Sequence, residues 1–539
     1  MAVLLRAAAV AAALLLFTAA PRTQPAGPRL LVILVVDQMR ADYLSRFRDT
    51  WRGGFRELLD RGVVFDRAAY PYLATWTCAG HATIGTGAFP RAHGMIANRW
   101  WRRDERRVAE CTDDPKAPAV SYGRPAKAGY SAAQLLVPTL ADELRAQQPG
   151  ARVAVVSLKS RSAITLAGRA PDAVTWFDDD AGSFVTSRAF AGGPLPAVQR
   201  FVARDPYEAD EGRSWTLRDD PATYRARDAG AGERPPAPWN SLFPHVVKGV
   251  QPRDAFFFDI WQTSPFADAY LGRMAAALVD ELSLGQRDAT DFLGVSFSSL
   301  DEVGHDFGPH SREVDDMLRH LDVTLGALVA HLDRRVGRER YVLALTADHG
   351  VVPIAQPQQG GRIFTEDVRD RIEETLAARL GPAPDGRYVD AVTEPFVYLA
   401  PGVFDRLRAD APALAAVRAA VLDLPGVSRV LRADRLSSAS ADPIVRAAAL
   451  TTASAHAGDL LVVPRPRFYF AQRVLANATT HGTPYAYDTR VPLIVMGGGL
   501  RARHVTRAVT PADIAPTLGA LAGVRLASAE GRVLPEVAR

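Results

Sequence analysis

The sequence predicts an α/β fold with a doubly wound, mostly parallel β-sheet and inserted cap or subdomain segments. Several short apolar runs have the length and composition of fully buried strands. They are Leu30–Val36, Val153–Ser157, Phe292–Phe297, Tyr341–Thr346 and Val491–Met496. Stretches with helical spacing of apolar residues separate or follow these runs, namely Val137–Gln147, Val314–Leu332 and Asp513–Ala522. Continuous apolar strands that alternate with helices indicate a sheet covered on both faces.

Three aspartates follow three of the predicted strands. Asp37 comes after ILVV, Asp301 after SFSSL and Asp348 after LALTA. The carboxyl ends of parallel strands meet at one edge of a sheet, and ligands of open α/β sheets bind beyond that edge. We therefore expect the three carboxylates to lie close together.

Two segments interrupt the alternation of strands and helices. The Pro-, Asp- and Arg-rich composition of residues 203–250 indicates an insertion dominated by loops. Residues 360–475 contain an acidic helix at Thr365–Leu380, a strand-like segment at Tyr388–Leu399 and a further alanine-rich helix. We expect one large domain over residues 30–539 with these two insertions, of which the second forms a cap or subdomain.

The N-terminus has the pattern of a secretory signal peptide. Arg6 supplies a positive charge, and Ala7–Ala20 is a run of 14 uncharged residues, too short for a comfortable membrane span. We expect a signal peptide within residues 1–26, with cleavage after Ala20 or near Ala26, or else an uncleaved anchor. No later stretch has 18 uninterrupted apolar residues, so we predict a periplasmic or secreted protein without a further transmembrane segment.

Charge and cysteine content exclude two classes of site. The net charge is only +4, and four of the 64 basic residues are lysines, so the high pI reflects arginine usage. Without a dense basic run we predict no nucleic-acid partner. Cys78 and Cys111 leave two possibilities open, a disulfide in an oxidising compartment or two buried thiols. Two cysteines do not support a structural zinc site.

Six potential metal ligands occur in four short clusters of the sequence. They are Asp37, the pair Asp301 and His305, the pair Asp348 and His349, and His481. Mixed carboxylate and imidazole ligation suits Zn²⁺, and with more water ligands it also suits Mn²⁺ or Fe²⁺. Three aspartates and three histidines would give each of two divalent cations three protein ligands. A single D-x-x-x-H pair is often an exposed contact on a helix, so the prediction of two metal ions rests on the whole set.

The segment TWTCAGHATIGTG contains a candidate nucleophile, Thr77. A helix that begins there would place unpaired N–H groups and the positive end of its dipole beside the hydroxyl, which favours the alkoxide. Coordination to a cation would activate the hydroxyl directly. The alternative is that Thr75 or Thr77 is merely an N-cap. With the metal ligands, Thr77 predicts hydrolysis of phosphoryl esters, whereas His81 is expected to pack or to form hydrogen bonds.

Three further residues are candidate donors to a phosphate group. Asn98 lies in MIANRWW, and Lys159 and Arg161 follow the predicted strand that ends at Ser157. If that strand continues, alternation places Lys159 and Arg161 on the same side. A lysine suits a site that needs a compact point charge. The alternative is that the pair lies in a solvated loop.

The order of these motifs resembles that of the alkaline phosphatase superfamily: a strand-end Asp, a Thr or Ser nucleophile, Asp-x-x-x-His, Asp-His and a late His. The match spans about residues 30 to 510, and it resembles most the bacterial periplasmic PafA-type alkaline phosphatases, which are related to the nucleotide pyrophosphatase/phosphodiesterases. The resemblance implies one zinc bound by Asp301, His305 and His481, and a second bound by Asp37, Asp348, His349 and the Thr77 hydroxyl. It also implies a covalent phospho-enzyme at Thr77 and phosphate contacts from Asn98, Lys159 and Arg161.

Related families differ at identifiable positions. Sulfatases carry C/S-x-P-x-R, whereas Cys78-Ala-Gly-His-Ala lacks the Pro and the Arg. Phosphodiesterase relatives typically have Thr-Phe-Pro-Asn-His at the nucleophile and lack the Lys-x-Arg pair. A monoester dianion carries more charge than a diester, so additional cations favour monoesters.

We therefore expect an exported two-zinc phosphate-monoester hydrolase of broad specificity, acting on small molecules, with no indication of its oligomeric state. A phosphodiesterase or nucleotide pyrophosphatase on the same scaffold is the first alternative, and a phosphotransferase the second. A non-enzymatic phosphate-binding protein would require the loss of a ligand or of the nucleophile, and the sequence retains both.

Overall fold

The computed structural model describes residues 27–356, 359–383, 385–453, 456–474 and 477–538. The predicted signal peptide, residues 1–26, lies outside the described residues. Within the described ranges, no helix is both long enough and apolar enough to span a bilayer.

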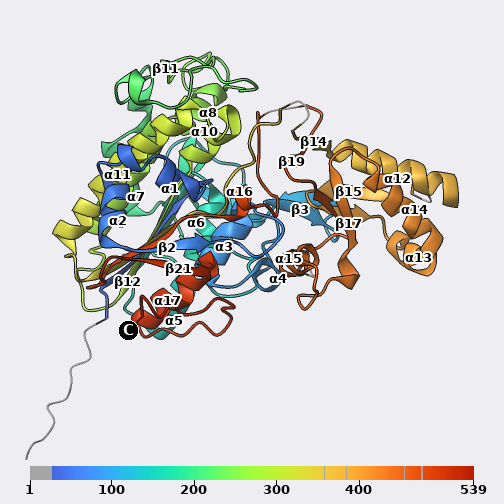
Figure 1. The fold of residues 1–539 in the computed structure, drawn as a ribbon. Helices are drawn as coiled ribbons and strands as arrows, with labels where there is room; N and C mark the ends of the chain where they lie inside the picture. Colours follow the sequence, from blue (N-terminus) through green and yellow to red (C-terminus); the bar gives the residue numbers. More distant parts are fainter. Residues whose placement is uncertain (1–26, 357–358, 384, 454–455, 475–476, 539) are drawn as a thin grey trace, which may run out of the picture.

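A large mixed β-sheet forms the centre of the molecule (Figure 1). Its strands, in spatial order, are β21 (Arg503–Val509), β2 (Val63–Ala68), β20 (Leu493–Gly497), β13 (Tyr341–Thr346), β1 (Leu30–Val36), β12 (Asp291–Phe297), β7 (Val153–Ser157), β8 (Ala173–Asp178), β9 (Ser183–Ser187), β5 (Asp113–Ser121) and β6 (Gly129–Tyr130). The five strands from β13 to β8 are all parallel, and antiparallel pairs flank them on both sides. The predicted α/β class with a mostly parallel sheet is therefore confirmed.

Alternate residues of β1 enter two separate hydrophobic layers, because successive side chains of a strand point to opposite faces. Leu30, Val32, Leu34 and Val36 pack in the layer covered by α9 (Pro265–Glu281) and α11 (Arg312–Arg335). Leu31, Ile33 and Val35 pack in the layer covered by α5 (Leu140–Gln147), α6 (Ser160–Ala167) and α17 (Ile514–Leu521). Every residue of β1 is buried, which explains its continuous apolar sequence.

Local capping accounts for where two of the predicted helices begin. The helix expected from Val137 begins at Leu140, because Thr139 and Asp142 form a capping box. The helix expected from Val314 begins at Arg312, where the Ser311 side chain accepts a hydrogen bond from the backbone of Val314. The strand expected at 491–496 is β20, which runs antiparallel to β13.

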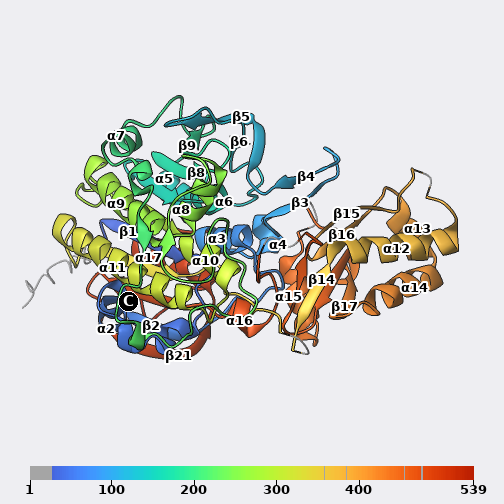
Figure 2. The same ribbon diagram turned by 90° about the horizontal axis from the view of Figure 1, so that it is seen from above.

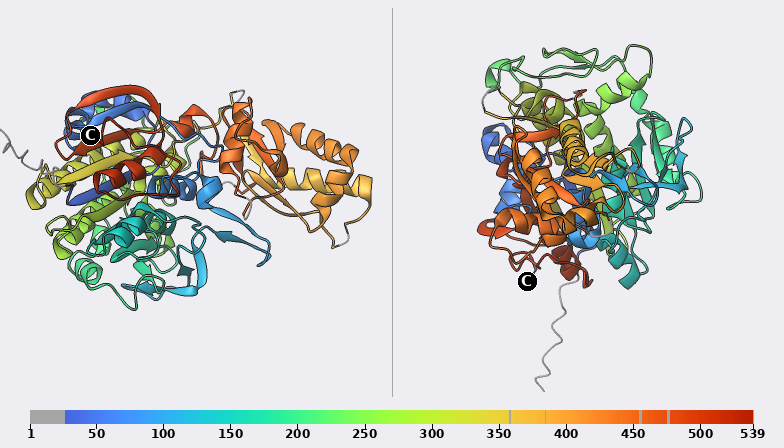
Figure 3. Two further views of the ribbon diagram at one scale, coloured as in Figure 1. Left: turned by 90° about the horizontal axis from the view of Figure 1, so that it is seen from below. Right: turned by 90° about the vertical axis from the view of Figure 1, so that its right-hand side faces the viewer.

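Residues 361–471 form sheets of their own beside the central sheet (Figure 2). One is four-stranded, in the order β15 (Val389–Thr393), β16 (Phe396–Leu399), β18 (Leu460–Pro464) and β17 (Val427–Arg432), and the other pairs β14 (Gly361–Phe364) with β19 (Phe468–Ala471). Helices α12 (Thr365–Leu380), α13 (Val403–Ala409) and α14 (Ala411–Leu422) pack on this side in a separate hydrophobic core. We propose that this unit is the inserted subdomain, and Figure 3 shows it extending from the core.

The segment 203–250 contains few regular elements. It has two 3₁₀ turns, η2 (Tyr207–Asp210) and η3 (Pro221–Thr223), and the two-residue strands β10 (Ser214–Trp215) and β11 (His245–Val246), which pair with each other. We propose that it is the loop-dominated insertion.

A shared hydrophobic core joins the subdomain to the segment around Thr77. Cys78 and Ala82 of α3 (Thr77–Thr86) belong to the same cluster as Tyr398 of β16 and Val463 of β18. The Thr451 hydroxyl, from α15 (Pro443–Thr451), also lies 2.8 Å from the backbone nitrogen of Leu73. Packing and hydrogen bonding therefore fix the subdomain against α3 and the segment that precedes it.

Candidate active site

The predicted ligands converge from elements that are distant in sequence. Asp37 directly follows β1, and Asp348 follows β13 by two residues. Asp301 is not at a strand end, because α10 (Ser299–Phe307) begins two residues after β12 and places Asp301 in its first turn. His305 is one helical turn later, on the same face. His481 lies in the loop between β19 and α16 (Ala486–Thr489).

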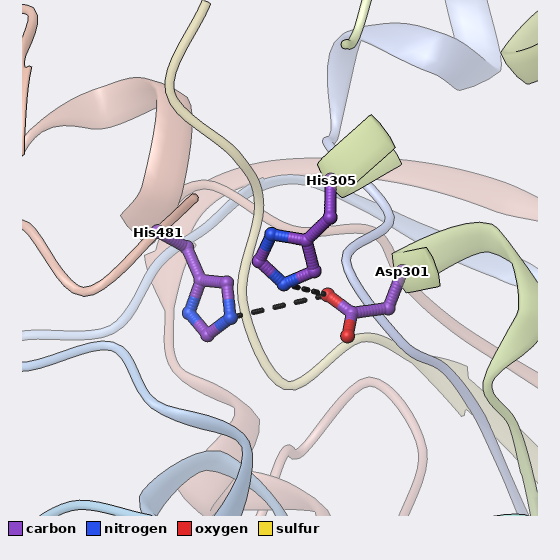
Figure 4. A group of neighbouring side chains, drawn as sticks. All are labelled: Asp301, His305 and His481. Atoms are coloured by element: carbon purple, nitrogen blue, oxygen red, sulfur yellow. Dashed lines mark ion pairs between the residues drawn. The ribbon is translucent and has the colours of Figure 1, made fainter. Parts of the chain in front are cut away.

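Asp301, His305 and His481 form one group of potential metal ligands (Figure 4). The Asp301 Oδ1 atom lies 3.3 Å from His305 Nε2 and 3.9 Å from His481 Nε2. Asp301 and His481 are buried. The three donor atoms therefore converge within the reach of one cation.

A second group consists of Asp37, Asp301 and His349, with Asp348 at its edge. His349 Nε2 lies 3.4 Å from Asp37 Oδ1 and 3.1 Å from Asp348 Oδ2. All of these side chains are buried. Because Asp301 belongs to both groups, the two candidate cation positions are adjacent.

Backbone carbonyls orient all three histidines. Nδ1 lies 2.8 Å from Thr479 O in His305, 2.9 Å from Gly350 O in His349 and 2.8 Å from Thr75 O in His481. A carbonyl oxygen can only accept a hydrogen bond, so each Nδ1 donates. In the neutral ring this leaves the Nε2 lone pair directed at the site, which is the arrangement of a metal ligand.

The buried carboxylates of this site fit divalent cations. Asp37 Oδ1 and Asp348 Oδ2 are buried and have no hydrogen-bond partner. Three buried carboxylates in one site are costly unless cations compensate their charge, and His349 is the neighbour of both oxygens, 3.4 Å from Asp37 Oδ1 and 3.1 Å from Asp348 Oδ2. Burial, together with the Asp301 carboxylate, raises the pKa of Asp37 well above its ordinary value. Two cations at the two groups would remove this penalty.

Lys159 lies among the carboxylates. Its Nζ contacts Asp301 Oδ2, lies 3.1 Å from Asp37 Oδ2 and lies 3.0 Å from Glu302 Oε1. Although burial disfavours its charged form, Asp301 and Asp37 raise the pKa of Lys159 well above its ordinary value. The ammonium therefore supplies part of the positive charge that this cluster requires.

The pair Lys159 and Arg161 is not placed by strand alternation. β7 ends at Ser157, Lys159 is the N-cap of α6, and Arg161 lies in the first turn of that helix. The solvated-loop alternative does not hold for Lys159, which is 8% exposed. Arg161 lines a cavity of about 350 Å³ together with Asn98 and His305.

Thr77 begins α3 and is fully buried. Its Oγ1 lies 3.2 Å from His349 Nε2. The N-cap of α3 is Trp76, and Thr75 Oγ1 instead donates to Thr483 O at 3.0 Å, so neither threonine caps the helix through its side chain. A Cβ at Gly80 would lie 2.3 Å from Asp348 O, so the glycine permits α3 to approach the loop that contains Asp348.

Both cysteines contact Asn98. They form a disulfide, which decides between the two possibilities left by the sequence. Cys78 N donates to Asn98 Oδ1 at 2.9 Å, and Cys111 N donates to Asn98 O at 2.8 Å. The Asn98 side-chain NH₂ is thus left as the group that can donate to a ligand.

Gln38 and His81 also contact proposed metal ligands. The contacts of Gln38 are not indicated by the sequence, which indicates only a packing or hydrogen-bonding role for His81. Gln38 adopts a positive φ of 67°, and its Nε2 donates to Asp301 Oδ1 at 2.5 Å while its N donates to Asp348 Oδ1 at 3.2 Å. His81 lies 3.3 Å from Asp348 Oδ2 and hydrogen bonds with Ser296 Oγ at 2.8 Å. Both residues orient proposed ligands. The only signal in the sequence was position: Gln38 directly follows Asp37, and His81 lies one helical turn after Thr77.

Comparisons with known proteins agree over nearly the whole chain. Residues 31–484 match the family described as type I phosphodiesterase / nucleotide pyrophosphatase. The chain is 30% identical over 533 residues to alkaline phosphatase PafA of Elizabethkingia meningoseptica, covering 95% of this chain and 94% of that protein. It is 30% identical over 529 residues to alkaline phosphatase PhoV of Synechococcus elongatus, covering 95% and 93%. The crystal structure of wild-type alkaline phosphatase PafA matches with a TM-score of 0.86 and 28% identity, covering 95% of this chain and 99% of that one.

Proposed function

Because this chain belongs to the type I phosphodiesterase / nucleotide pyrophosphatase family, we propose that it is an alkaline phosphatase, a phosphate-monoester hydrolase that uses two Zn²⁺ ions and a phosphothreonine intermediate. The resemblance expected from the motif order is confirmed by relatives that are themselves alkaline phosphatases. The observation that carries the proposal is the convergence of six acidic and imidazole side chains beside a buried threonine at a helix N-terminus.

The proposed ligand sets follow the two groups of donors. Asp301, His305 and His481 would hold one zinc, and Asp37, Asp348, His349 and the Thr77 hydroxyl would hold the other. Bound zinc would act as a Lewis acid on the phosphoryl group and favour deprotonation of the hydroxyls involved.

Thr77 is the proposed nucleophile. Its Oγ1 would lose a proton and bond to phosphorus while the ester P–O bond breaks, so that the alcohol leaves and phosphothreonine remains. Water would then bond to phosphorus, which releases inorganic phosphate and restores the threonine hydroxyl. The N-terminal end of α3 supports both steps, because its free N–H groups favour negative charge.

Asn98, Lys159 and Arg161 are the proposed partners of the remaining phosphoryl oxygens. Asn98 and Arg161 line the cavity next to His305, and Lys159 lies among the ligand carboxylates. A monoester dianion has one more charged oxygen than a diester monoanion. The positive charges of Lys159 and Arg161 would therefore stabilise a bound monoester more than a bound diester. Because Asn98, Lys159 and Arg161 would all contact the phosphoryl group and not the alcohol, these three contacts support broad specificity.

The family description favours one alternative function, hydrolysis of phosphodiesters. Steady-state kinetics on 4-nitrophenyl phosphate and bis(4-nitrophenyl) phosphate separate the two. We expect a higher kcat/KM for the monoester, and Lys159→Ala should lower the monoester value more than the diester value. A higher kcat/KM for the diester would overturn the proposal, and equal losses on both substrates would overturn the role of Lys159.

Chelation tests the metal requirement in the same assay. We expect removal of metal to abolish monoester hydrolysis, zinc to restore it, and metal analysis to give two zinc ions per chain. Full activity of a demonstrably metal-free protein would contradict the mechanism.

Export is a separate part of the proposal, and it rests on the sequence of residues 1–26. Cell fractionation of a C-terminally tagged chain, with N-terminal sequencing of the mature protein, tests it. We expect periplasmic or secreted protein that begins after Ala20 or near Ala26, or a membrane-associated chain with its N-terminus intact. A full-length cytoplasmic protein would contradict it.

A further inference from the structure

The cavity beside the proposed phosphoryl site is walled partly by the inserted subdomain. Asn98, Arg161 and His305 line it from the catalytic core, whereas Arg362 and Tyr469 line it from β14 and β19 of the subdomain. Asn98 and Arg161, which are proposed to contact the phosphoryl oxygens, therefore share one cavity with groups from a different structural unit. In a phosphate ester, the leaving group is the part that would extend toward such a second wall.

The Arg362 side chain is held in one orientation. In the parallel pair β14–β19, Arg362 is in register with Tyr469, and its guanidinium lies 5.5 Å from the centre of that ring. Arg362 Nη2 donates to Ala478 O at 3.0 Å, and the Tyr469 hydroxyl donates to the same oxygen at 2.9 Å. The stacking and the hydrogen bond reduce the conformational entropy lost when a ligand binds to the guanidinium.

The carbonyl that fixes Arg362 belongs to the segment that positions a proposed metal ligand. Ala478 N donates to His305 O at 2.9 Å, and the next residue, Thr479, accepts from His305 Nδ1 at 2.8 Å. Arg362 is thus coupled through one residue to the backbone of His305. Its position relative to the phosphoryl site is set by this short, hydrogen-bonded connection.

Arg362 has no acidic partner among the residues that the structure describes. Among the described residues, no carboxylate oxygen lies within 4.0 Å of its guanidinium nitrogens, and its buried Nε has no hydrogen-bond partner. Glu110 and Glu394 line the same cavity. Burial raises the pKa of both, and the cations that oppose this rise are Arg161 and Arg99 for Glu110 and Arg99 for Glu394. Arg362 therefore retains a charge with no acidic partner among the described residues, an unfavourable state that an anionic ligand would relieve.

We propose that Arg362 forms a subsite for a second anionic group, a carboxylate or a phosphate, carried by the leaving group of the ester. This inference rests on the proposed phosphatase function and adds a preference among its substrates. The planar guanidinium suits both anions, because it can donate two parallel hydrogen bonds to either. The favoured substrates are phosphate monoesters of acidic alcohols and phenols, including bisphosphates.

The test compares three aryl phosphates on the zinc-loaded enzyme. 4-Carboxyphenyl phosphate and 4-(phosphonomethyl)phenyl phosphate carry the second anion, and 4-carbamoylphenyl phosphate is the neutral reference. For each anionic substrate we take the ratio of its kcat/KM to that of the reference. In Arg362→Gln we expect this ratio to fall about tenfold, mostly through KM, because one charge-assisted interaction of about 1.4 kcal/mol is lost. Arg362→Lys should keep the charge and lose less.

Arg371→Gln is the matched control for loss of one positive charge from the subdomain. Arg371 lies on α12, where it is paired with Asp423 at 3.9 Å and does not line the cavity. The control should leave the ratios unchanged. A drop for the carboxylate alone or for the phosphonate alone would assign the subsite to that anion.

Two outcomes separate the failure of this inference from the failure of the function. If the wild-type enzyme hydrolyses the neutral reference, but Arg362→Gln changes neither ratio, the subsite is refuted while the phosphatase stands. If the zinc-loaded wild-type enzyme hydrolyses none of the three monoesters, the function itself is refuted. If Arg362→Gln fails to fold, Arg362→Lys still tests the subsite. We expect a smaller fall in the two ratios, and unchanged ratios in Arg362→Lys would refute bidentate recognition by the guanidinium.

Discussion

The backbone N–H of Cys78 donates to Asn98 Oδ1 at 2.9 Å, which links the residue after the proposed nucleophile to a proposed phosphate ligand. Cys111 holds the other side of Asn98, because its N donates to Asn98 O at 2.8 Å. A disulfide joins Cys78 and Cys111, the two residues whose backbone nitrogens donate to Asn98. Asn98 is therefore fixed relative to Thr77 by two hydrogen bonds and one covalent bond.

Removal of the disulfide should impair catalysis through Asn98. We expect the double variant Cys78→Ser/Cys111→Ser to lose about tenfold in kcat/KM for an aryl phosphate, since a misplaced donor forfeits a charge-assisted hydrogen bond. Asn98→Ala should lose a similar factor. The triple variant should be little worse than Asn98→Ala, because residues that act as a unit are non-additive.

A fully additive loss in the triple variant would show that the disulfide does not act through Asn98. Zinc content and thermal unfolding of all three variants serve as controls. Serine substitution is preferred to a thiol reductant, because thiols can compete for the zinc.

Thr77→Ala should lose almost all turnover while it still binds metal. The side chain contacts His349 but contributes only one of the proposed ligands, so the other donors remain. Thr77→Ser should retain a nucleophilic hydroxyl and keep substantial activity. Mass spectrometry of acid-quenched Thr77→Ser should detect a phosphorylated serine, and phosphorylation elsewhere, or none with turnover intact, would contradict the role of Thr77.

The sequence predicted five of the eleven strands of the central sheet, namely β1, β7, β12, β13 and β20, each of which is an apolar run that is buried along its whole length. Every residue of β1 is buried, so the apolar run and the strand coincide. Asp301 was placed at a strand end because the sequence SFSSL does not show where β12 stops and α10 begins. Gln38 could not be anticipated either, since its contacts with Asp301 and Asp348 bridge more than 260 positions of sequence.

The approach of the subdomain depends on similarly distant contacts. Arg362 reaches the cavity only through the pairing of β14 with β19 and the hydrogen bond to Ala478, 116 residues away. An amphipathic pattern identifies helices and strands within residues 360–475, but it contains no information about which face meets the catalytic core. The proposed ligand residues were easier to identify as candidates, because their types and spacing are themselves informative.

Zinc binding should release protons near neutral pH. In the metal-free protein, burial alone would lower the pKa of His305 and of His349, but Asp301 and Asp348 beside them raise both to about 9. Zinc binds neutral imidazole, so its binding at pH 7 must displace the protons of His305 and His349. The affinity for zinc should therefore rise as the pH rises toward 9. Titration calorimetry in two buffers with different ionisation enthalpies measures the release. Zinc binding without net proton release at pH 7 would contradict the prediction.

Lys159→Met should destabilise the metal-free protein more than the zinc-loaded one. The ammonium lies 3.1 Å from Asp37 Oδ2 and also contacts Asp301, and it is 8% exposed. Removing one partner from a buried ionic cluster costs about 3–5 kcal/mol, and zinc would replace the missing charge. Denaturant unfolding with and without zinc measures the difference. The exposed Lys248→Met is the control, and an equal loss in both metal states would exclude this role.

Glu313 should make the protein less stable at alkaline pH. Its side chain is fully buried, Oε1 lies 3.3 Å from His245 Nε2, and Oε2 has no hydrogen-bond partner. Burial, together with the nearby Asp228, raises the pKa of Glu313 from 4.5 to about 8. Between these two values the folded chain retains a proton that the unfolded chain releases, so the free energy of unfolding falls as pH rises from about 4.5 to about 8. Glu313→Gln cannot ionise, and we expect it to be more stable than the wild type at pH 9 by up to roughly 5 kcal/mol, with little difference at pH 5. Denaturant unfolding at both pH values measures the difference in stability, with the exposed Glu374→Gln as control. If the effect of Glu313→Gln on the free energy of unfolding is the same at pH 5 and pH 9, the raised pKa of Glu313 is contradicted.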